Sequence, residues 1–256
     1  MNEWLNIVFR WIHVLAGVLW IGHLYFFNFV NAQVAKTYDA ESKKKVVPEL
    51  MPRALYWFRW GAAWTWVTGI LLLGVVYYMG GTLLEPESTM SLGVGSIIGL
   101  GVLLVGFGLY DALWKTGLKS NVMAGTVVSL VLLAAITWGL SRVFTGRAVF
   151  IHVGSILGTI MAANVWMRIW PSQRKIIAAI KDGQAPDAAI VALAGMRSRH
   201  NTFMSVPLLF LMVSNHYPTV YGGPGGWVFA LGFVVAGFLV ASFLFSRSAA
   251  PSPARY

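Results

Sequence analysis

Long apolar stretches separated by short polar segments dominate this sequence. Seven of them are long enough for a membrane-crossing helix, which needs about 20 apolar residues to span about 30 Å of hydrocarbon. They predict helices at about residues 4–31, 54–80, 92–114, 122–143, 147–170, 200–217 and 225–246. The sixth is the shortest and contains Pro207. The pattern predicts an all-α integral membrane protein, with residues 1–256 forming one bundle of about seven transmembrane helices.

The polar segments alternate in charge along the chain. The segments after the first, third, fifth and seventh stretches are basic, and the segments after the second and sixth carry no base. Their basic residues are Lys36, Lys43, Lys44, Lys45, Arg53, Lys115, Lys119, Arg174, Lys175, Lys181, Arg197, Arg199, Arg247 and Arg255. Cytoplasmic segments are enriched in Lys and Arg, so we expect the N-terminus outside and the C-terminus in the cytoplasm. Arg142 and Arg147, after the fourth stretch, are the exceptions.

The longest polar segment, residues 171–199, predicts a helical hairpin on the cytoplasmic interface. Pro171 is expected to end the fifth stretch, because proline disrupts a continuing helix. Asp187 follows Gly183-Gln184-Ala185-Pro186 and predicts the N-cap of a second short helix. A docking surface for a partner protein is the alternative reading of this segment.

Composition narrows the class further. Hydrophobic residues make up 57% of the chain and charged residues 11%, against about 25% charged in soluble domains. Soluble enzymes, disordered proteins and disulfide scaffolds are therefore excluded. The absence of Cys excludes disulfides, thiolate zinc sites, iron–sulfur clusters and covalently attached c-type haem. The net charge of +10 is explained by anchoring of cytoplasmic loops to the lipid bilayer, so we expect no nucleic-acid partner.

All five histidines lie within or at the ends of the apolar stretches. Ionisable residues at membrane depth are costly, and they mark functional sites unless they serve helix packing. The predicted orientation sorts them into an outer layer of His13, His152 and His216 and an inner layer of His23 and His200. Imidazoles on facing helices can bind non-covalent haem, so one or two b-type haems are expected, with the outer three as candidates for iron ligands.

Other polar residues within the stretches suggest an anion site. Asn164, Arg168 and Asn201 are candidates for binding a polar heterocycle, because a guanidinium pairs with planar anions through two hydrogen bonds. The alternatives are hydrogen bonds between helices for the asparagines and snorkelling to the interface for the arginine. The ridge of Gly154, Gly158 and Ala162 beside His152 suits either a bulky cofactor or plain helix packing.

Three blocks of the sequence resemble the bacterial membrane-bound urate oxidases (urate hydroxylases). They are Trp11 to Phe29, containing His13 and His23; His152 to Val165, with Ile169 to Lys175; and Arg197 to Pro218. The resemblance implies a membrane oxidoreductase of the bacterial inner membrane that acts in purine catabolism on urate or a related heterocycle. Members of that family typically carry a C-terminal cytochrome c domain. This sequence has none, so its electrons are expected to pass through haem to a separate cytochrome c or to a quinone.

Two other functions remain open at this stage. The same histidines suit a non-catalytic b-type cytochrome subunit of a respiratory assembly. They also suit a copper or solute transporter, because the His-x₆-Trp-Ile-Gly pattern that begins at His13 also resembles copper-resistance membrane proteins. A reduced-minus-oxidised haem spectrum separates the transporter from the other two functions.

Overall fold

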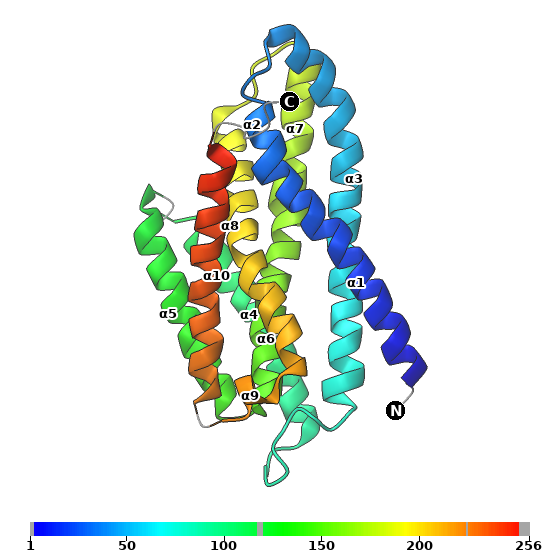
Figure 1. Cartoon of the computed structure of the whole chain (residues 1–256), viewed down its shortest axis with the longest axis vertical. Coiled ribbons are helices and arrows are strands. Elements are labelled where there is room, and N and C mark those ends of the chain that lie inside the picture. The colour runs from blue at the N-terminus through cyan, green and yellow to red at the C-terminus, as the bar shows by residue number, and fades with distance from the viewer. Residues whose placement is uncertain (1–2, 117–119, 224, 251–256) are drawn as a thin grey trace. The chain divides into compact units, whose positions relative to one another are not determined.

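The computed structural model describes residues 3–116, 120–223 and 225–250. All regular secondary structure in these ranges is helical, which confirms the all-α prediction (Figure 1). Lys119 and Arg255, which contributed to the predicted orientation, lie outside the described residues.

Eight helices of twelve or more residues make up most of the described chain, with shorter helical elements between them. The long helices are α1 (Glu3–Tyr25), α3 (Ala40–Leu73), α4 (Leu92–Leu113), α5 (Val122–Ser141), α6 (Gly146–Asn164), α7 (Trp170–Lys181), α8 (Ala188–Val213) and α10 (Gly226–Ala249). The short ones are α2 (Ala32–Val34), α9 (Pro218–Tyr221) and a 3₁₀ turn at Ser214–His216. Wider π-helical turns follow α1 (Phe26–Asn31) and α3 (Gly74–Tyr78) and connect α6 to α7 (Val165–Ile169).

Six of the described helical segments are long and apolar enough to cross a membrane. They are Glu3–Val34, Ala40–Tyr78, Leu92–Leu113, Val122–Ser141, Gly146–Lys181 and Gly226–Ala249. Each contains most of one predicted stretch, so six of the seven predictions correspond to such a helix. These lengths and compositions suit a multi-pass membrane protein.

The predicted sixth span, residues 200–217, does not form a separate apolar helix. Residues 200–213 are the second half of α8, which begins at Ala188 and continues through Pro207 to Val213, and the 3₁₀ turn Ser214–His216 follows. Arg197 and Arg199 lower the local hydropathy, which predicts a polar loop, but in the structure both residues lie inside α8. The prediction of seven apolar spans is therefore not confirmed.

Pro171 does not end the helix that contains His152. The helical segment continues from Gly146 to Lys181, with the π-helical turn Val165–Ile169 directly before the proline. Pro171 lies in the first turn of α7, directly after the π-helical turn that already interrupts the regular α-helical hydrogen-bond pattern. Residues 171–199 comprise most of α7, a short connection at residues 182–187 and the start of α8, so two helices joined by a short connection lie in this segment. Its position on the cytoplasmic interface stays a prediction.

Asp187 is an N-cap as predicted, but the helix that it begins, α8, is 26 residues long and not short. Its carboxylate accepts hydrogen bonds from the backbone N–H groups of Ala189 (2.7 Å) and Ile190 (3.2 Å). These groups have no acceptor within the helix, so the cap stabilises the start of α8.

The helix that contains the second apolar stretch, α3, begins at Ala40, earlier than the predicted start at about residue 54. Asp39 caps it by accepting a hydrogen bond from the Ser42 backbone N–H at 2.7 Å. This bond to the ionised carboxylate lowers the pKa of Asp39 below its ordinary value. Pro48 and Pro52 are accommodated inside α3.

The chain forms two compact units. Unit 1 contains Met1–Trp11, Trp66–Ile160 and Pro207–Ala236, and unit 2 contains Ile12–Thr65, Met161–Val206 and Gly237–Tyr256. The helices α1, α3, α6, α8 and α10 contribute residues to both.

Glycines allow close helix packing within unit 1. The buried face of α4 includes Gly95, Gly99 and Gly106, and a Cβ atom at Gly106 would lie 2.7 Å from the Ile156 side chain on α6. A Cβ atom at Gly154 of α6 would likewise contact Met212 and lie 3.2 Å from Leu211 on α8. Within unit 1, Gly154 therefore serves helix packing, which favours plain packing over a bulky cofactor at this position.

Unit 2 has its own close contacts. A Cβ atom at Gly61 of α3 would lie 3.0 Å from the Trp20 backbone nitrogen on α1, so the two helices meet backbone to backbone. Asn28 donates a hydrogen bond to Ser198 at 2.9 Å, and the hydroxyls of Tyr25 and Ser205 lie 3.0 Å apart. These polar contacts connect the first helix of the chain to α8.

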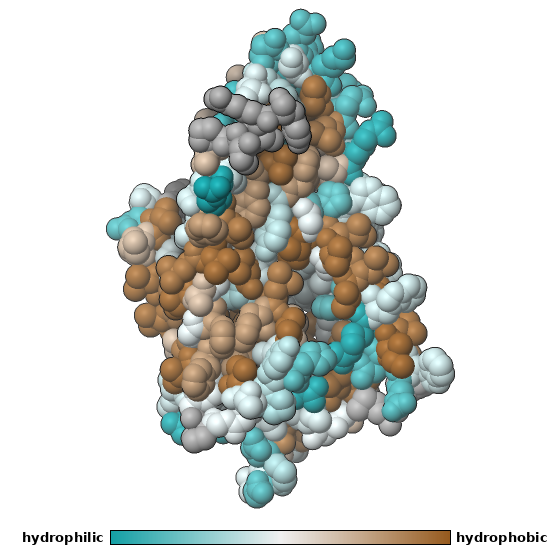
Figure 2. Space-filling view, viewed as in Figure 1, coloured by the Kyte–Doolittle hydropathy of each residue, from teal (hydrophilic) through white to brown (hydrophobic). Residues whose placement is uncertain are grey.

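Apolar side chains cover much of the visible surface of the helices (Figure 2). Large hydrophobic residues with more than half of their surface exposed include Ile97, Leu104, Val131 and Leu239. In water such a surface would cause aggregation, whereas lipid tails solvate it.

Candidate functional site

A buried polar cluster lies between α6 and α8 in unit 2. Asn164, Arg197 and Asn201 are each 0% exposed. Asn164 donates to the Asn201 side-chain oxygen at 2.9 Å, and Asn201 donates to the Met161 carbonyl at 2.9 Å. Arg197 donates to the Asn164 side-chain oxygen at 3.4 Å. The two asparagines predicted from the sequence are thus brought together, with a guanidinium beside them.

The arginine of this cluster is Arg197, not the predicted Arg168. Arg168 lies in the π-helical turn, is partly exposed, and donates to the Met167 carbonyl at 3.4 Å. The apolar pattern places Arg197 in a polar segment, because the predicted span begins at residue 200. Its spacing of four residues from Asn201 places both on one face of α8, and this was the signal that could have identified it.

Three of the five histidines belong to unit 2. His13, His23 and His200 are all partly buried. The Nδ1 atom of His23 lies 2.6 Å from the Leu19 carbonyl oxygen, and its ring lies 6.5 Å from that of Phe27. A histidine held in this way by Nδ1 presents Nε2 to a ligand, which is the usual arrangement of a metal-binding imidazole.

His152 lies in unit 1 and is 0% exposed. Its Nδ1 atom lies 2.7 Å from the Ala148 carbonyl oxygen, and its Nε2 atom lies 3.0 Å from the Tyr78 hydroxyl. The Phe144 ring packs against it at 4.9 Å between centroids. A Cβ atom at Gly99 would lie 2.7 Å from both Nε2 and the Tyr78 hydroxyl, so α4 closes the remaining side.

A second arginine–asparagine cluster lies in unit 1. The side-chain oxygen of Asn215 accepts hydrogen bonds from the Tyr77 hydroxyl (2.7 Å) and from Arg147 Nε (2.9 Å). The Arg147 guanidinium also lies 5.8 Å from the centre of the Tyr77 ring. The neighbouring His216 is exposed. Arg147, one of the two exceptions to the charge pattern, therefore has a defined structural partner.

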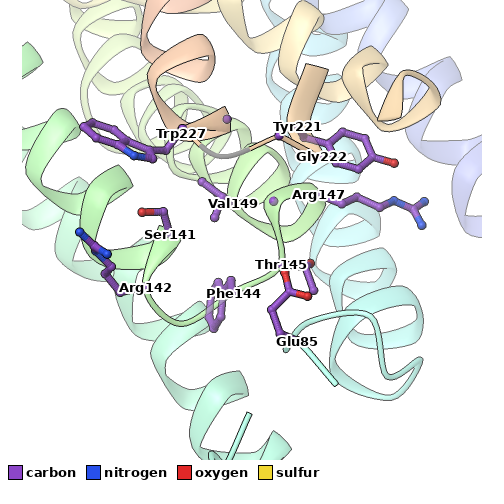
Figure 3. A pocket seen from close by; sticks show the side chains of 14 residues that line it. Glu85, Ser141, Arg142, Phe144, Thr145, Arg147, Val149, Tyr221, Gly222 and Trp227 are labelled. Atoms are coloured by element: carbon purple, nitrogen blue, oxygen red, sulfur yellow. The ribbon is translucent and has the colours of Figure 1, made fainter. Parts of the chain in front are cut away.

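A cavity of about 560 Å³ lies beside this cluster in unit 1. Figure 3 shows Arg142 and Arg147 on opposite sides of it, with Glu85, Phe144 and Tyr221 among the other lining residues. Cavities of this size suit small organic ligands. Phe144 both lines the cavity and packs against the buried His152.

The histidines differ in how well they fit the predicted haem. The ring orientation of His23 suits an axial ligand, since its Nε2 atom makes no hydrogen bond within the described residues. The surroundings of His152 do not fit an axial haem ligand, because Tyr78 and Gly99 occupy the space in front of its Nε2 atom. Within the described part of the chain, no three His, Asp or Glu side chains gather as a metal site.

The fold and these clusters define a class: an all-helical protein whose long apolar helices are compatible with a multi-pass membrane protein, with ionisable and amide side chains buried among them. Its sequence matches the family model described as urate oxidase N-terminal over residues 1–45 and 37–255. The chain belongs to this family, which confirms the resemblance at family level. Comparison with curated proteins and with solved structures gave no match.

Proposed function

We propose that this chain is a membrane oxidoreductase that oxidises urate or a related heterocyclic anion. On this proposal, b-type haem carries the electrons to a separate cytochrome c or to a quinone. The observation that carries it is the fully buried Arg197–Asn164–Asn201 cluster in a chain of the urate oxidase N-terminal family. A buried guanidinium beside two amides matches a flat anion that both donates and accepts hydrogen bonds.

The residues of the cluster have separate roles in the proposal. Arg197 balances the negative charge of the substrate and binds two of its acceptors in one plane. Asn201 is oriented by its hydrogen bond to the Met161 carbonyl. Asn164 hydrogen-bonds to the donors and acceptors along the edge of the substrate. The cluster is closed, so binding requires local separation of α6 from α8. The π-helical turn Val165–Ile169 directly follows Asn164, and such turns are points where a helix changes its register.

His23 is the residue that fits an axial haem ligand in unit 2. The Leu19 carbonyl fixes its ring and keeps the proton on Nδ1, which leaves the Nε2 lone pair for the iron. Haem bound there would accept electrons one at a time. His13 and His200 belong to the same unit and are the proposed sources of a second axial ligand.

The experiment measures urate binding to the purified protein by titration calorimetry. Arg197→Lys keeps the charge but loses the planar fork, so binding should weaken by about 10-fold or more. Arg199→Lys is the matched control, because Arg199 is exposed and stacks on Phe245 at 4.5 Å. Equal weakening by both substitutions, or by neither, contradicts the assignment of Arg197.

The Arg147–Asn215 cluster is the competing location, because it lies beside a cavity. Arg147→Lys therefore belongs in the same titration series. If this substitution alone abolishes binding, the substrate site lies in unit 1 and the unit 2 cluster is structural.

Spectra separate the proposed enzyme from the two other functions. Haem reduction on addition of urate supports the oxidoreductase. Haem that urate does not reduce supports a b-type cytochrome subunit, and a colourless protein from haem-supplied cells supports a transporter. His23→Ala should lower the ratio of haem to protein, whereas Trp57→Ala, on an exposed part of α3, should not.

The proposal places the chain in the bacterial inner membrane, with its N-terminus outside and its C-terminus in the cytoplasm. It rests on the alternation of basic segments with segments such as Glu85–Glu87, which carry no base.

A further inference from the structure

Two arginines in unit 2 face the same indole ring. The guanidinium carbon of Arg59 on α3 lies 4.0 Å from the centre of a Trp170 ring, and that of Arg174 on α7 lies 5.9 Å from it. Arg59 also lies within about 6 Å of the Tyr56 and Trp166 rings. A guanidinium stacked on an aromatic face keeps its N–H donors in the ring-parallel plane, where they can bind an anion.

One of these donors lacks an acceptor. The Nε atom of Arg59 is buried and makes no hydrogen bond within the described residues. Buried donors in folded proteins are nearly always satisfied, so an acceptor from outside the chain is the simplest completion. The nearby carboxylate of Glu49, which precedes Arg59 on α3, pairs with Arg53 at 3.4 Å and not with Arg59.

The surface next to this pair is aromatic and exposed. Trp57, Trp60 and Trp64 of α3 are 52%, 40% and 53% exposed. The Trp60 ring packs at 5.5 Å against Trp166, which follows α6 in the chain. Tryptophan is enriched where headgroups meet acyl chains, and Arg59 separates the basic start of α3 from its apolar remainder. Cations beside exposed aromatic rings at such a boundary match the chemistry of a phospholipid.

We propose that Arg59, Trp170 and Arg174 bind the phosphate of an anionic phospholipid, whose acyl chains lie along Trp60 and Trp64. The two guanidinium groups donate hydrogen bonds to the phosphate oxygens, and Arg59 Nε gains its acceptor. The site is independent of urate and of haem.

The test measures which lipids remain bound to the purified protein, using native mass spectrometry after exchange into detergent with defined lipids. Wild-type protein should retain phosphatidylglycerol and cardiolipin over phosphatidylcholine. The double variant Arg59→Gln, Arg174→Gln should lose on the order of 10-fold in that preference. The variant Arg53→Gln, Lys175→Gln is the control, because it removes the same charge from neighbouring exposed positions.

A second measurement uses only the wild-type protein, in case the double variant does not fold. Phosphatidylglycerol should raise the melting temperature, and phosphatidylcholine or inorganic phosphate at the same concentration should not. Equal stabilisation by inorganic phosphate would show a free-anion site and overturn the proposal. So would equal lipid retention by the double variant and its control. A concentration-dependent dimer that is lost in Trp60→Ala, Trp64→Ala with lipid retention unchanged would assign the aromatic surface to a second copy of the chain.

Discussion

Replacing Gly99 with alanine tests the packing around His152. A Cβ atom there would lie 2.7 Å from both His152 Nε2 and the Tyr78 hydroxyl, which are themselves hydrogen-bonded at 3.0 Å. The methyl group must push these two atoms apart. We expect a loss of about 0.5–1.5 kcal/mol for the buried hydrogen bond and about 1–3 kcal/mol for overpacking. The higher helix propensity of alanine returns about 1 kcal/mol.

The net expectation for Gly99→Ala is a destabilisation of about 0.5–3.5 kcal/mol, with a midpoint of about 2 kcal/mol. Gly108→Ala is the matched control on the same helix, because nothing lies within 4 Å of a Cβ atom at Gly108. The control should be neutral or more stable by up to about 1 kcal/mol. Thermal unfolding in one detergent, followed by circular dichroism, should therefore separate the two variants by roughly 5–10 °C.

Equal melting temperatures for the two variants would refute this description of α4 packed against His152. A double-mutant cycle with Tyr78→Phe adds a second criterion, because removing the hydroxyl removes one of the two clashing atoms. Gly99→Ala should then cost less in the Tyr78→Phe background than in the wild type. Additive costs would mean that Tyr78 plays no part in the clash.

Three further predictions concern the helix ends and the orientation. Asp187→Ala should destabilise the start of α8 by about 1 kcal/mol, seen as faster amide exchange at Ala189 and Ile190, whereas exposed Asp182→Ala should leave it unchanged. Because hydrogen bonding to Ser42 lowers the pKa of Asp39, its cap should hold above the ordinary value of 3.8 and be lost as the pH falls below it; a Ser42 amide signal that does not respond to this titration contradicts the cap. A reporter fused after Arg247 should read as cytoplasmic and one near Glu85 as periplasmic, and the reverse pair of results would invert the proposed orientation.

The apolar pattern predicted six of the long helices because each fills most of a membrane-length stretch. The apolar pattern did not predict the correct start of a helix that contains charged residues. Arg197 and Arg199 lower the hydropathy of α8 at its middle, so the pattern placed a helix start at residue 200 instead of 188. Hydropathy reports transfer into lipid, and it cannot recognise a polar side chain that is buried against other polar side chains.

The polar cluster was predicted only in part for the same reason. Asn164 and Asn201 were identified as membrane-depth amides, and their hydrogen bond links α6 to α8. Arg197 was missed together with the first half of its helix. The Tyr78–His152 bond joins residues 74 positions apart, and no local pattern contains such information.

The π-helical turn Val165–Ile169 affects how one-residue insertions and deletions between members of this family should be interpreted. A π turn holds one more residue than the α-helical turn it replaces, so it behaves as a one-residue insertion absorbed without a loop. Removing one residue, such as Trp166, would restore a regular α-helix and rotate everything after it by about 100° relative to Asn164. A one-residue length difference here between two relatives would therefore change which side chains face the buried amides while the helix itself stays intact.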